Sequence, residues 1–319
     1  MKRIRPTSAT NSHSSSSTTN GLPAMTPPRV EGFILLRALA RPALVLLLLL
    51  VLCYGGIVAY LYSHQRQLIY LPQFTRQPVM ETNFSVDVDG LSLKGWVVNA
   101  GKRDALIYFG GNGEAVQRNV DDFRQWVPDR SSYLVPYRGY GPNAGEPSQD
   151  ALFADALRLF DSVKARHPDG RIAVVGRSLG TGVASYVASR RDIERLVLVT
   201  PFDSMVSMAG ARYPWLPIDW MLEERFESDR FLSGLDVPLL LLRAGRDEVI
   251  PPAATDRLIA SLPKTPDVIR FPNARHNDVD GFPGYWPAIA EFLGNEQDAL
   301  RLPDPAPGPA EPRDPAPVR

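Results

Sequence analysis

The sequence has few of the residues that build thiol chemistry and metal sites. It contains one cysteine, Cys53, and four histidines. A single cysteine excludes an intramolecular disulfide and any metal site built from several thiolates. Basic and acidic residues are equally frequent, with 35 of each, so the overall charge gives no indication of a nucleic-acid partner. The composition is that of an ordinary globular protein.

Charge is absent from one long stretch near the N-terminus. Residues 43–62 (ALVLLLLLVLCYGGIVAYLY) form a run of 20 uncharged, mostly apolar residues. About 20 such residues are needed for a helix to cross a bilayer, so the run predicts one retained transmembrane anchor. The alternative is a cleaved signal peptide. The apolar run is too long for that reading, and no clear cleavage site follows it.

The sequence on either side of this run predicts how the chain is oriented. Residues 1–42 are expected to be a disordered basic segment, because Ser, Thr, Asn and Pro dominate its first part. Six basic residues precede the run and only two follow it closely: Lys2, Arg3, Arg5, Arg29, Arg37 and Arg41 before it, Arg66 and Arg76 after it. The positive-inside rule therefore predicts a cytoplasmic N-terminus and a domain on the far side, the periplasm in a Gram-negative bacterium.

Residues 63–296 show the pattern of one α/β domain. Two strand-like stretches flank the hairpin signal Asp89-Gly90, and strand and helix patterns then alternate to the end of the domain. This order predicts a mostly parallel central sheet with helices on both faces. Residues 202–236 interrupt the alternation and are expected to form a small cap region. Residues 297–319 are rich in proline and are expected to be a disordered tail.

The most informative motif of the domain is Gly176-Arg177-Ser178-Leu179-Gly180. It follows the apolar run 172–175 and precedes a helix of small and apolar residues, which is the strand–turn–helix setting of a G-x-S-x-G nucleophile. In that setting the Ser178 hydroxyl stands clear of the sheet, and the N–H of Leu179 points into the same space. Ser178 is therefore the candidate nucleophile.

A serine nucleophile needs a base, and the base needs an acid to orient it. His276 is the candidate base by elimination, since His13 lies in the N-terminal segment, His64 at the end of the apolar run, and His167 at a helix end. Asp247 is the candidate acid because it follows an apolar strand at the sheet edge where α/β proteins build their sites. Asp203 is the alternative for the same reason.

The glycine-rich turn Gly110-Gly111-Asn112-Gly113 is the second part of the candidate site. Small residues after a strand let backbone amides face a ligand. The backbone N–H of Asn112 is therefore expected to form an oxyanion hole together with the N–H of Leu179. No metal or cofactor is required for this chemistry.

A series of short motifs in this order resembles the membrane-anchored ABHD-type family of α/β-hydrolase-fold serine hydrolases. The motifs lie between residues 65 and 294: LIYLP at 68–72, YFGGNGE at 108–114, YRGYG at 137–141, GRSLG at 176–180, PFDS at 201–204, GRDEVIP at 245–251 and HND at 276–278. The resemblance implies the α/β-hydrolase fold and hydrolysis of esters or thioesters. One departure is Gly110, which stands where the family usually has histidine.

The expected activity is hydrolysis of carboxylic esters or thioesters by a Ser-His-Asp triad. The expected partner is an acyl ester or thioester, lipid esters included, and nucleic acid is not expected. Two alternatives remain: an acyltransferase that uses the same site, and a non-catalytic scaffold tethered to the membrane.

Overall fold

The computed structural model describes residues 30–76 and 80–294 and divides the chain into two compact units, Met1–Ile57 and Val58–Arg319. The Pro-rich tail 297–319 lies outside the described residues, as do residues 1–29 of the segment expected to be disordered. Residues 30–42 of that segment are helical instead, because helix α1 begins at Val30 and runs to Ile69. Extending an existing helix costs little compared with starting one, so α1 can continue before the uncharged run although Pro42 lies inside the helix.

Helix α1 contains the uncharged run predicted as a membrane anchor. By length and composition the apolar helix can cross a membrane, with a mean hydropathy of 2.7 in its most apolar window. The leucine and valine side chains from Leu44 to Leu52 are exposed. Such a surface fits a lipid environment better than water.

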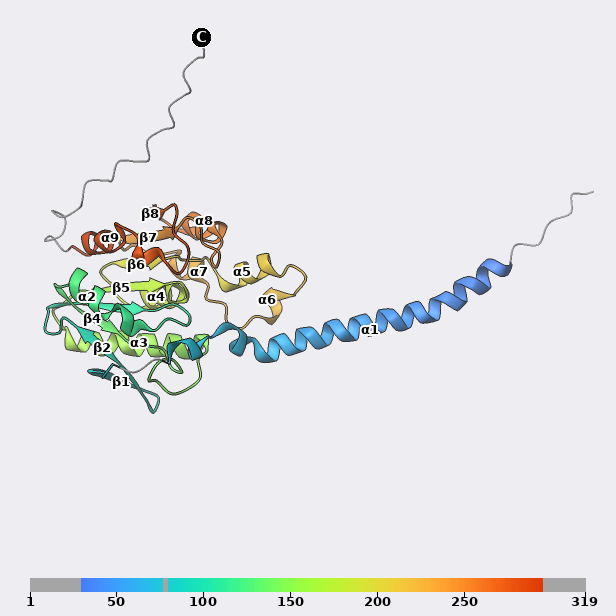
Figure 1. The fold of residues 1–319 in the computed structure, drawn as a ribbon, viewed down its shortest axis with the longest axis horizontal. Coiled ribbons are helices and arrows are strands. Elements are labelled where there is room, and N and C mark those ends of the chain that lie inside the picture. Colours follow the sequence, from blue (N-terminus) through green and yellow to red (C-terminus); the bar gives the residue numbers. More distant parts are fainter. Residues whose placement is uncertain (1–29, 77–79, 295–319) are drawn as a thin grey trace, which may run out of the picture. The chain divides into compact units, whose positions relative to one another are not determined.

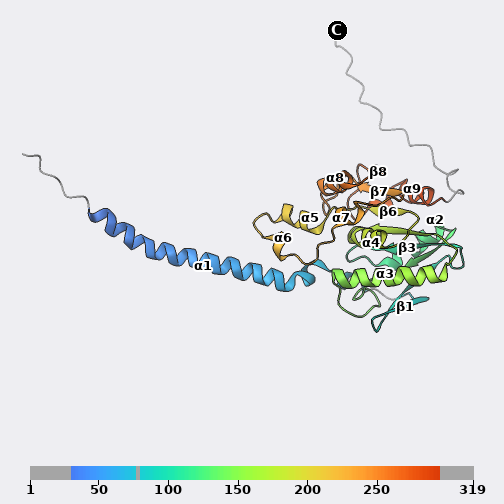
Figure 2. The ribbon, with the colours of Figure 1, turned by 180° about the vertical axis from the view of Figure 1, so that it is seen from behind.

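The second unit is built around one eight-stranded sheet with the order β1-β2-β4-β3-β5-β6-β7-β8. Figures 1 and 2 show β1 at one edge of this sheet and β8 at the other. β1 pairs with β2 and β2 with β4 in antiparallel register, whereas all later pairs are parallel. The strands are Phe84–Val88, Leu91–Val98, Asp104–Phe109, Arg130–Leu134, Ile172–Arg177, Leu196–Val199, Leu239–Ala244 and Asp267–Phe271, numbered β1 to β8 in that order. The predicted parallel α/β sheet is confirmed.

Helices connect the strands and cover both faces of the sheet. The α-helices after α1 are α2 (Val120–Trp126), α3 (Gln149–Arg166), α4 (Leu179–Arg190), α5 (Met205–Arg212), α6 (Ile218–Met221), α7 (Ser228–Leu232), α8 (Pro252–Ser261) and α9 (Tyr285–Phe292). Three short 3₁₀ helices are η1 (Pro72–Thr75), η2 (Val116–Asn119) and η3 (Val279–Gly281). Side chains of α3, α4, α7 and α8 share one core, and those of α2 and α9 share the other.

The interior strands are buried on both faces because their sequences are continuous apolar runs. Every residue of β6 is fully buried, and so are the first five residues of β5. The antiparallel β1 instead alternates buried and exposed residues, as expected for a strand with one face in water. The parallel strands therefore place their carboxyl ends at one edge, where loops can gather functional groups.

The region 202–236, expected to be a cap, contains three short helices, α5 to α7. Phe226 and Leu232 are fully buried in the core, whereas α5 contains no buried residue. The segment thus combines a part of the core with the exposed helix α5, and α6 lies between them with Ile218 and Met221 buried. Its role as a cap stays a prediction.

Candidate active site

Ser178 occupies the turn between β5 and α4, as the motif predicts. Its φ of 51° is in the left-handed region, which is unfavourable for a residue with a side chain. Three hydrogen bonds hold the turn. The Ser178 N–H donates to the carbonyl of Val199 (2.9 Å), and the N–H (2.9 Å) and hydroxyl (2.6 Å) of Thr181 both donate to the carbonyl of Ser178. The strained backbone holds the side chain at the end of the central strand.

The two glycines of the motif allow the strand and the helix to approach closely. A Cβ atom at Gly180 would lie 2.1 Å from the carbonyl oxygen of Phe109, and one at Gly176 would lie 2.4 Å from the carbonyl oxygen of Gly180. Neither backbone atom can move without displacing a buried strand or helix. The spacing of this motif is therefore a packing requirement of the turn.

His276 and Asp247 lie within hydrogen-bond distance of each other and of Ser178. The Ser178 hydroxyl is 2.8 Å from Nε2 of His276, and Nδ1 of the same ring is 2.8 Å from Oδ2 of Asp247. The side chains of His276 and Asp247 are only 6% and 4% exposed. Oδ1 of Asp247 also accepts the N–H groups of Val249 (2.9 Å) and Ile250 (2.7 Å), which orient the carboxylate.

The alternative acid Asp203 has other partners. Its carboxylate accepts from Nε of Arg257 (2.6 Å) and from the hydroxyl of Ser207 (2.6 Å). His167 ends α3, and its Nε2 lies 2.9 Å from the hydroxyl of Tyr133. The structure thus brings Asp247, and not Asp203, together with His276.

The glycine-rich loop after β3 lies beside Ser178. A Cβ atom at Gly111 would lie 3.5 Å from Cβ of Ser178. One at Gly110 would lie 2.5 Å from Cγ1 of Val116, so a histidine at position 110 would require Val116 to move. The hydroxyl of Tyr137 donates to the carbonyl of Gly110 at 2.8 Å and holds this part of the loop. Glycine at position 110 thus fits the packing of this loop.

Glu114 fixes the same loop and was not identified from the sequence. Its Oε2 accepts the N–H of Gly111 (2.5 Å), and its Oε1 accepts from the hydroxyl of Tyr108 (2.6 Å) and from Nδ2 of Asn119 (2.6 Å). Arg177 lies 3.8 Å from this carboxylate. The position of Glu114 directly after the glycine-rich turn 110–113 is the sequence signal that could have indicated this role.

Arg177 is a buried cation next to the candidate nucleophile. Its side chain is 12% exposed and lies 3.5 Å from Asp280. Burial alone would lower the pKa of the Arg177 guanidinium, but the negative charges of Glu114 and Asp280 raise that pKa above its ordinary value. The group therefore stays charged, and its charge is balanced inside the site.

The segment that follows helix α1 forms one wall of the site. A cavity of about 420 Å³ opens at Ser178, and Leu71 and Phe74 line it together with the glycine-rich loop. The side chain of Asn112 ties the loop to this segment, since its Nδ2 donates to the carbonyl of Ile69 (2.5 Å) and its Oδ1 accepts the N–H of Leu71 (3.0 Å). None of residues 202–236, all of which the structure describes, lines this cavity.

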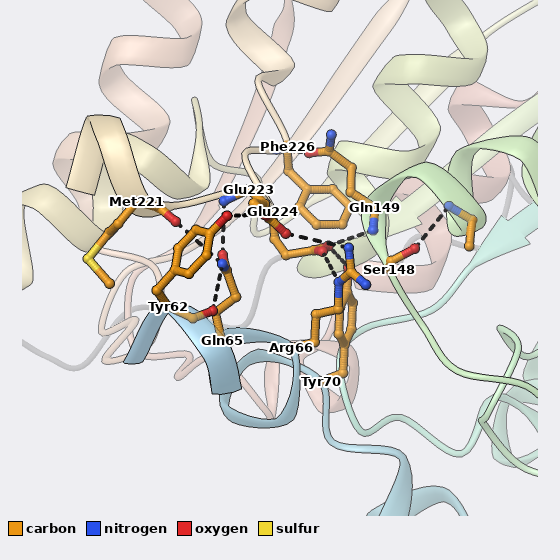
Figure 3. A network of polar contacts seen from close by, with 11 residues as sticks. Tyr62, Gln65, Arg66, Tyr70, Ser148, Gln149, Met221, Glu223, Glu224 and Phe226 are labelled. Atoms are coloured by element: carbon orange, nitrogen blue, oxygen red, sulfur yellow. Dashed lines mark hydrogen bonds and ion pairs between the residues drawn. The ribbon is translucent and has the colours of Figure 1, made fainter. Parts of the chain in front are cut away.

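Figure 3 shows how the last turns of α1 are fastened to the domain. Glu224 is 1% exposed, and its carboxylate accepts from Nε of Arg66 (2.9 Å), from the hydroxyl of Tyr70 and from the N–H of Gln149 (2.5 Å). A buried carboxylate is stable only when it is paired and hydrogen-bonded. Glu224 therefore makes residues 66–70 an integral part of the domain, a role that their sequence does not indicate.

Five buried tyrosines around the site and this junction predict a sharp loss of stability at alkaline pH. Burial raises the pKa of Tyr70, Tyr108, Tyr137, Tyr140 and Tyr285 above the usual value for a phenol. Below about pH 10 these phenols are protonated in both states, so they do not change the free energy of unfolding. Above about pH 10 they ionise only in the unfolded chain, and each phenol then lowers the free energy of unfolding by about 1.4 kcal/mol per pH unit.

This expectation is tested by following tyrosinate absorbance and far-ultraviolet circular dichroism together through a base titration. The late part of the absorbance change should coincide with unfolding. Full ionisation of all tyrosines near pH 10 in a chain that keeps its circular dichroism would contradict the prediction.

Within residues 30–76 and 80–294, no group of three or more His, Cys, Asp or Glu side chains is arranged to hold a metal ion. The expectation that the chemistry needs no cofactor stays a prediction.

Comparisons with known proteins place the chain in a family. No family model matches it. An uncharacterised protein of Mycobacterium tuberculosis, Rv2307c, is 31% identical over 266 residues, which cover 79% of this chain and 95% of the relative. The α/β hydrolase domain-containing protein WAV2 of Arabidopsis thaliana is 24% identical and covers 75% of this chain and 92% of its own length. Lysophosphatidylserine lipase ABHD12 of Xenopus tropicalis is 36% identical over 134 residues, 36% of this chain and 34% of the lipase.

Among solved structures, the esterase Pf2001 of Pyrococcus furiosus has a TM-score of 0.56 and 18% identity, and it covers 69% of this chain and 95% of its own. That likeness shows the α/β-hydrolase fold. The Mycobacterium relative matches most of both chains, and WAV2 is named as an α/β hydrolase domain-containing protein. The chain therefore belongs to the ABHD-type family of α/β hydrolases.

Proposed function

We propose that the protein is a membrane-anchored serine hydrolase that cleaves carboxylic esters or thioesters. One observation carries this proposal: the hydroxyl of Ser178, the imidazole of His276 and the carboxylate of Asp247 form a continuous chain of two contacts, each 2.8 Å long. This is the arrangement that activates a serine. Esterases among the structural neighbours and a lipase among the relatives support the same class of reaction.

The proposed reaction proceeds through an acyl-enzyme. Nε2 of His276 takes the Ser178 proton as the oxygen attacks the acyl carbonyl, while the Asp247 carboxylate holds Nδ1–H and stabilises the imidazolium. The imidazolium then protonates the leaving alcohol or thiol, and an acyl-serine remains. Water attacks this ester with His276 as the base, which releases the acid and restores the serine.

Two backbone N–H groups are proposed to bind the oxyanion. The N–H of Leu179 is in the first turn of α4, where helical N–H groups have no partner within the helix. The N–H of Asn112 belongs to the loop beside Ser178, and the side-chain contacts of Asn112 and Glu114 hold that loop in place. Preorganised donors of this kind contribute strongly, since removal of one typically costs about 100- to 1000-fold in rate.

Glu114→Gln should lower kcat about 10- to 100-fold with little change in KM, because a small displacement of the oxyanion loop is costly in the transition state. Three donors face the Glu114 carboxylate. A glutamine offers one oxygen to them and adds a donor of its own. Glu114 acts here as a positioning residue. Ester hydrolysis kinetics and a thermal melt check this effect, with the exposed Glu291→Gln in α9 as the control. An unchanged kcat in folded Glu114→Gln would contradict it.

The lining of the cavity favours a substrate that is apolar at one end and polar at the other. Leu71, Phe74 and Val249 contribute apolar surface, whereas Arg118, Asn119 and Asn277 contribute polar groups. Lipid esters with one acyl chain and a polar headgroup combine both properties, and ABHD12 is named as a lipase for such a lipid. We therefore propose acyl esters of lipids as the first substrate class to test.

The proposed anchor is the apolar part of helix α1, with the N-terminus in the cytoplasm and the hydrolase domain on the far side, the periplasm in a Gram-negative bacterium. The apolar composition of the helix and the excess of basic residues before it support this orientation. A single helix of this kind would hold the cavity close to lipid substrates.

The function is tested with the full chain in lipid nanodiscs. Labelling by a fluorophosphonate and turnover of acyl esters of graded chain length are the expected results. Faster transfer to added alcohols than to water would favour the acyltransferase alternative. A folded chain with neither labelling nor turnover would overturn the proposal and leave the non-catalytic scaffold.

A further inference from the structure

Three large aromatic side chains are exposed on the segment formed by α5 and α6. Tyr213 is 46% exposed, Trp215 54% and Trp220 80%. Together they are called the aromatic patch here. Tryptophan and tyrosine side chains bury large apolar areas when they can, so three exposed ones within eight residues of sequence are a candidate contact with an apolar or interfacial environment.

The segment that carries the patch is bonded to the end of helix α1, as Figure 3 shows. The hydroxyl of Tyr62 donates to Oε1 of Glu223 (2.8 Å). Gln65 makes two hydrogen bonds with residues 221–223. Its Nε2 donates to the carbonyl of Met221 (3.4 Å), and its Oε1 accepts the N–H of Glu223 (2.9 Å). Met221 is the last residue of α6 and is buried.

These contacts limit how far Trp220 can be from the end of the proposed membrane span. Tyr62 is the last residue of the uncharged run 43–62, and its partner Glu223 is only three residues from Trp220. Three residues extend over roughly 10 Å at most. The bilayer adds polar headgroup regions of roughly 5–8 Å on each side of its hydrocarbon core. Gln65 is bonded to Met221, the neighbour of Trp220, so Trp220 lies beside the last turns of α1 and close to the end of the proposed span.

We propose that the aromatic patch inserts into the headgroup region of the bilayer that holds residues 43–62. This inference rests on the membrane anchor of the proposed function. The occupant of the patch is lipid, because indole and phenol groups have an apolar body and a polar N–H or O–H and favour this boundary. Arg212, at the end of α5, supplies a cation for lipid phosphates next to Tyr213. The domain then touches the membrane at two places, the helix and the patch, which restricts its rotation about the anchor.

The sequence makes a direct test possible. The chain has five tryptophans, and none lies in residues 43–62, so tryptophan emission comes from the domain alone. The full chain is placed in nanodiscs whose lipids carry bromine on the acyl chains close to the headgroup, and emission is compared with that in unbrominated discs. We expect quenching of the wild type to fall by more than about half in the double variant Trp215→Phe/Trp220→Phe, since interfacial tryptophans are the ones near the bromines.

Trp286→Phe is the matched control. This indole packs against Phe123 with ring centroids 5.2 Å apart and belongs to the core between α2 and α9. Its replacement should leave the quenching unchanged. Phenylalanine preserves an aromatic ring at all three positions, and a thermal melt of each variant checks the fold.

Two results would overturn the proposed insertion of the aromatic patch while leaving the proposed membrane anchor intact. One is quenching that is equal in the wild type and the double variant. The other is an unquenched wild type present as two copies per disc, which would assign the patch to a second copy of the chain. A chain that does not enter the discs at all would overturn the anchor and the patch together.

Discussion

Ser178→Ala is expected to abolish fluorophosphonate labelling and to lower kcat/KM for acyl esters by roughly 10⁴- to 10⁶-fold. The Ser178 hydroxyl is the group 2.8 Å from Nε2 of His276, and alanine leaves no oxygen to attack a carbonyl. The oxyanion donors and the cavity would remain, so a small residual rate and nearly normal substrate binding are expected. Intact-mass analysis after labelling, together with steady-state kinetics in nanodiscs, measures both effects.

Ser185→Ala is the control for this variant. Ser185 is fully buried on α4, the helix that follows Ser178, and its hydroxyl donates to the carbonyl of Thr181 at 2.7 Å. Its loss should cost about 1 kcal/mol of stability and leave labelling intact. Labelling of Ser178→Ala at the wild-type rate would show that another residue is the nucleophile.

Asp247→Asn has the second largest expected effect, a loss of about 10⁴-fold in kcat. Asparagine keeps an oxygen for the N–H groups of Val249 and Ile250, so the loop should survive. Its amide NH₂, however, donates where the carboxylate accepts. The His276 ring is then held in the wrong tautomer, and the imidazolium loses its negative partner. The pH dependence of kcat, measured beside a thermal melt, separates this effect from unfolding.

Asp203→Asn is the matched variant because Asp203 is the other aspartate that the sequence suggests as the acid. It pairs with Arg257 and Ser207, so its substitution should lower the melting temperature and change kcat less than about 10-fold. The opposite pattern, an inactive Asp203→Asn and an active Asp247→Asn, would reverse the assignment of the acid.

Much of the fold follows from local pattern. The strands Leu91–Val98, Leu196–Val199 and Asp267–Phe271 and the helix Gln149–Arg166 follow the alternation of strand and helix patterns that the sequence shows. Apolar alternation, apolar runs and helix-end signals depend on a few consecutive residues. The elements that they predict are found in the fold when tertiary packing favours the same local structure. Helix α1 begins at Val30, before the predicted anchor 43–62, because extending a helix costs less than starting one.

The candidate site was predictable where a motif carries its own geometry. The glycines around Ser178 are required by contacts of 2.1 to 2.4 Å that any side chain would make, so the turn is visible in the sequence. The choice between Asp247 and Asp203 was open, because both follow strands whose carboxyl ends lie on the same edge. Only the loops beyond those strands bring one of them to His276.

The sequence by itself determined the α/β sheet, the apolar helix and the turn that holds Ser178, since each depends on residues adjacent along the chain. The tertiary structure decided which groups meet across long separations. It pairs Tyr70 with Glu224, ties Asn112 to Leu71, and surrounds Glu114 with three donors. No periodic sequence pattern predicts these polar contacts. Each joins residues from two elements, and only the packing of the core brings those elements together.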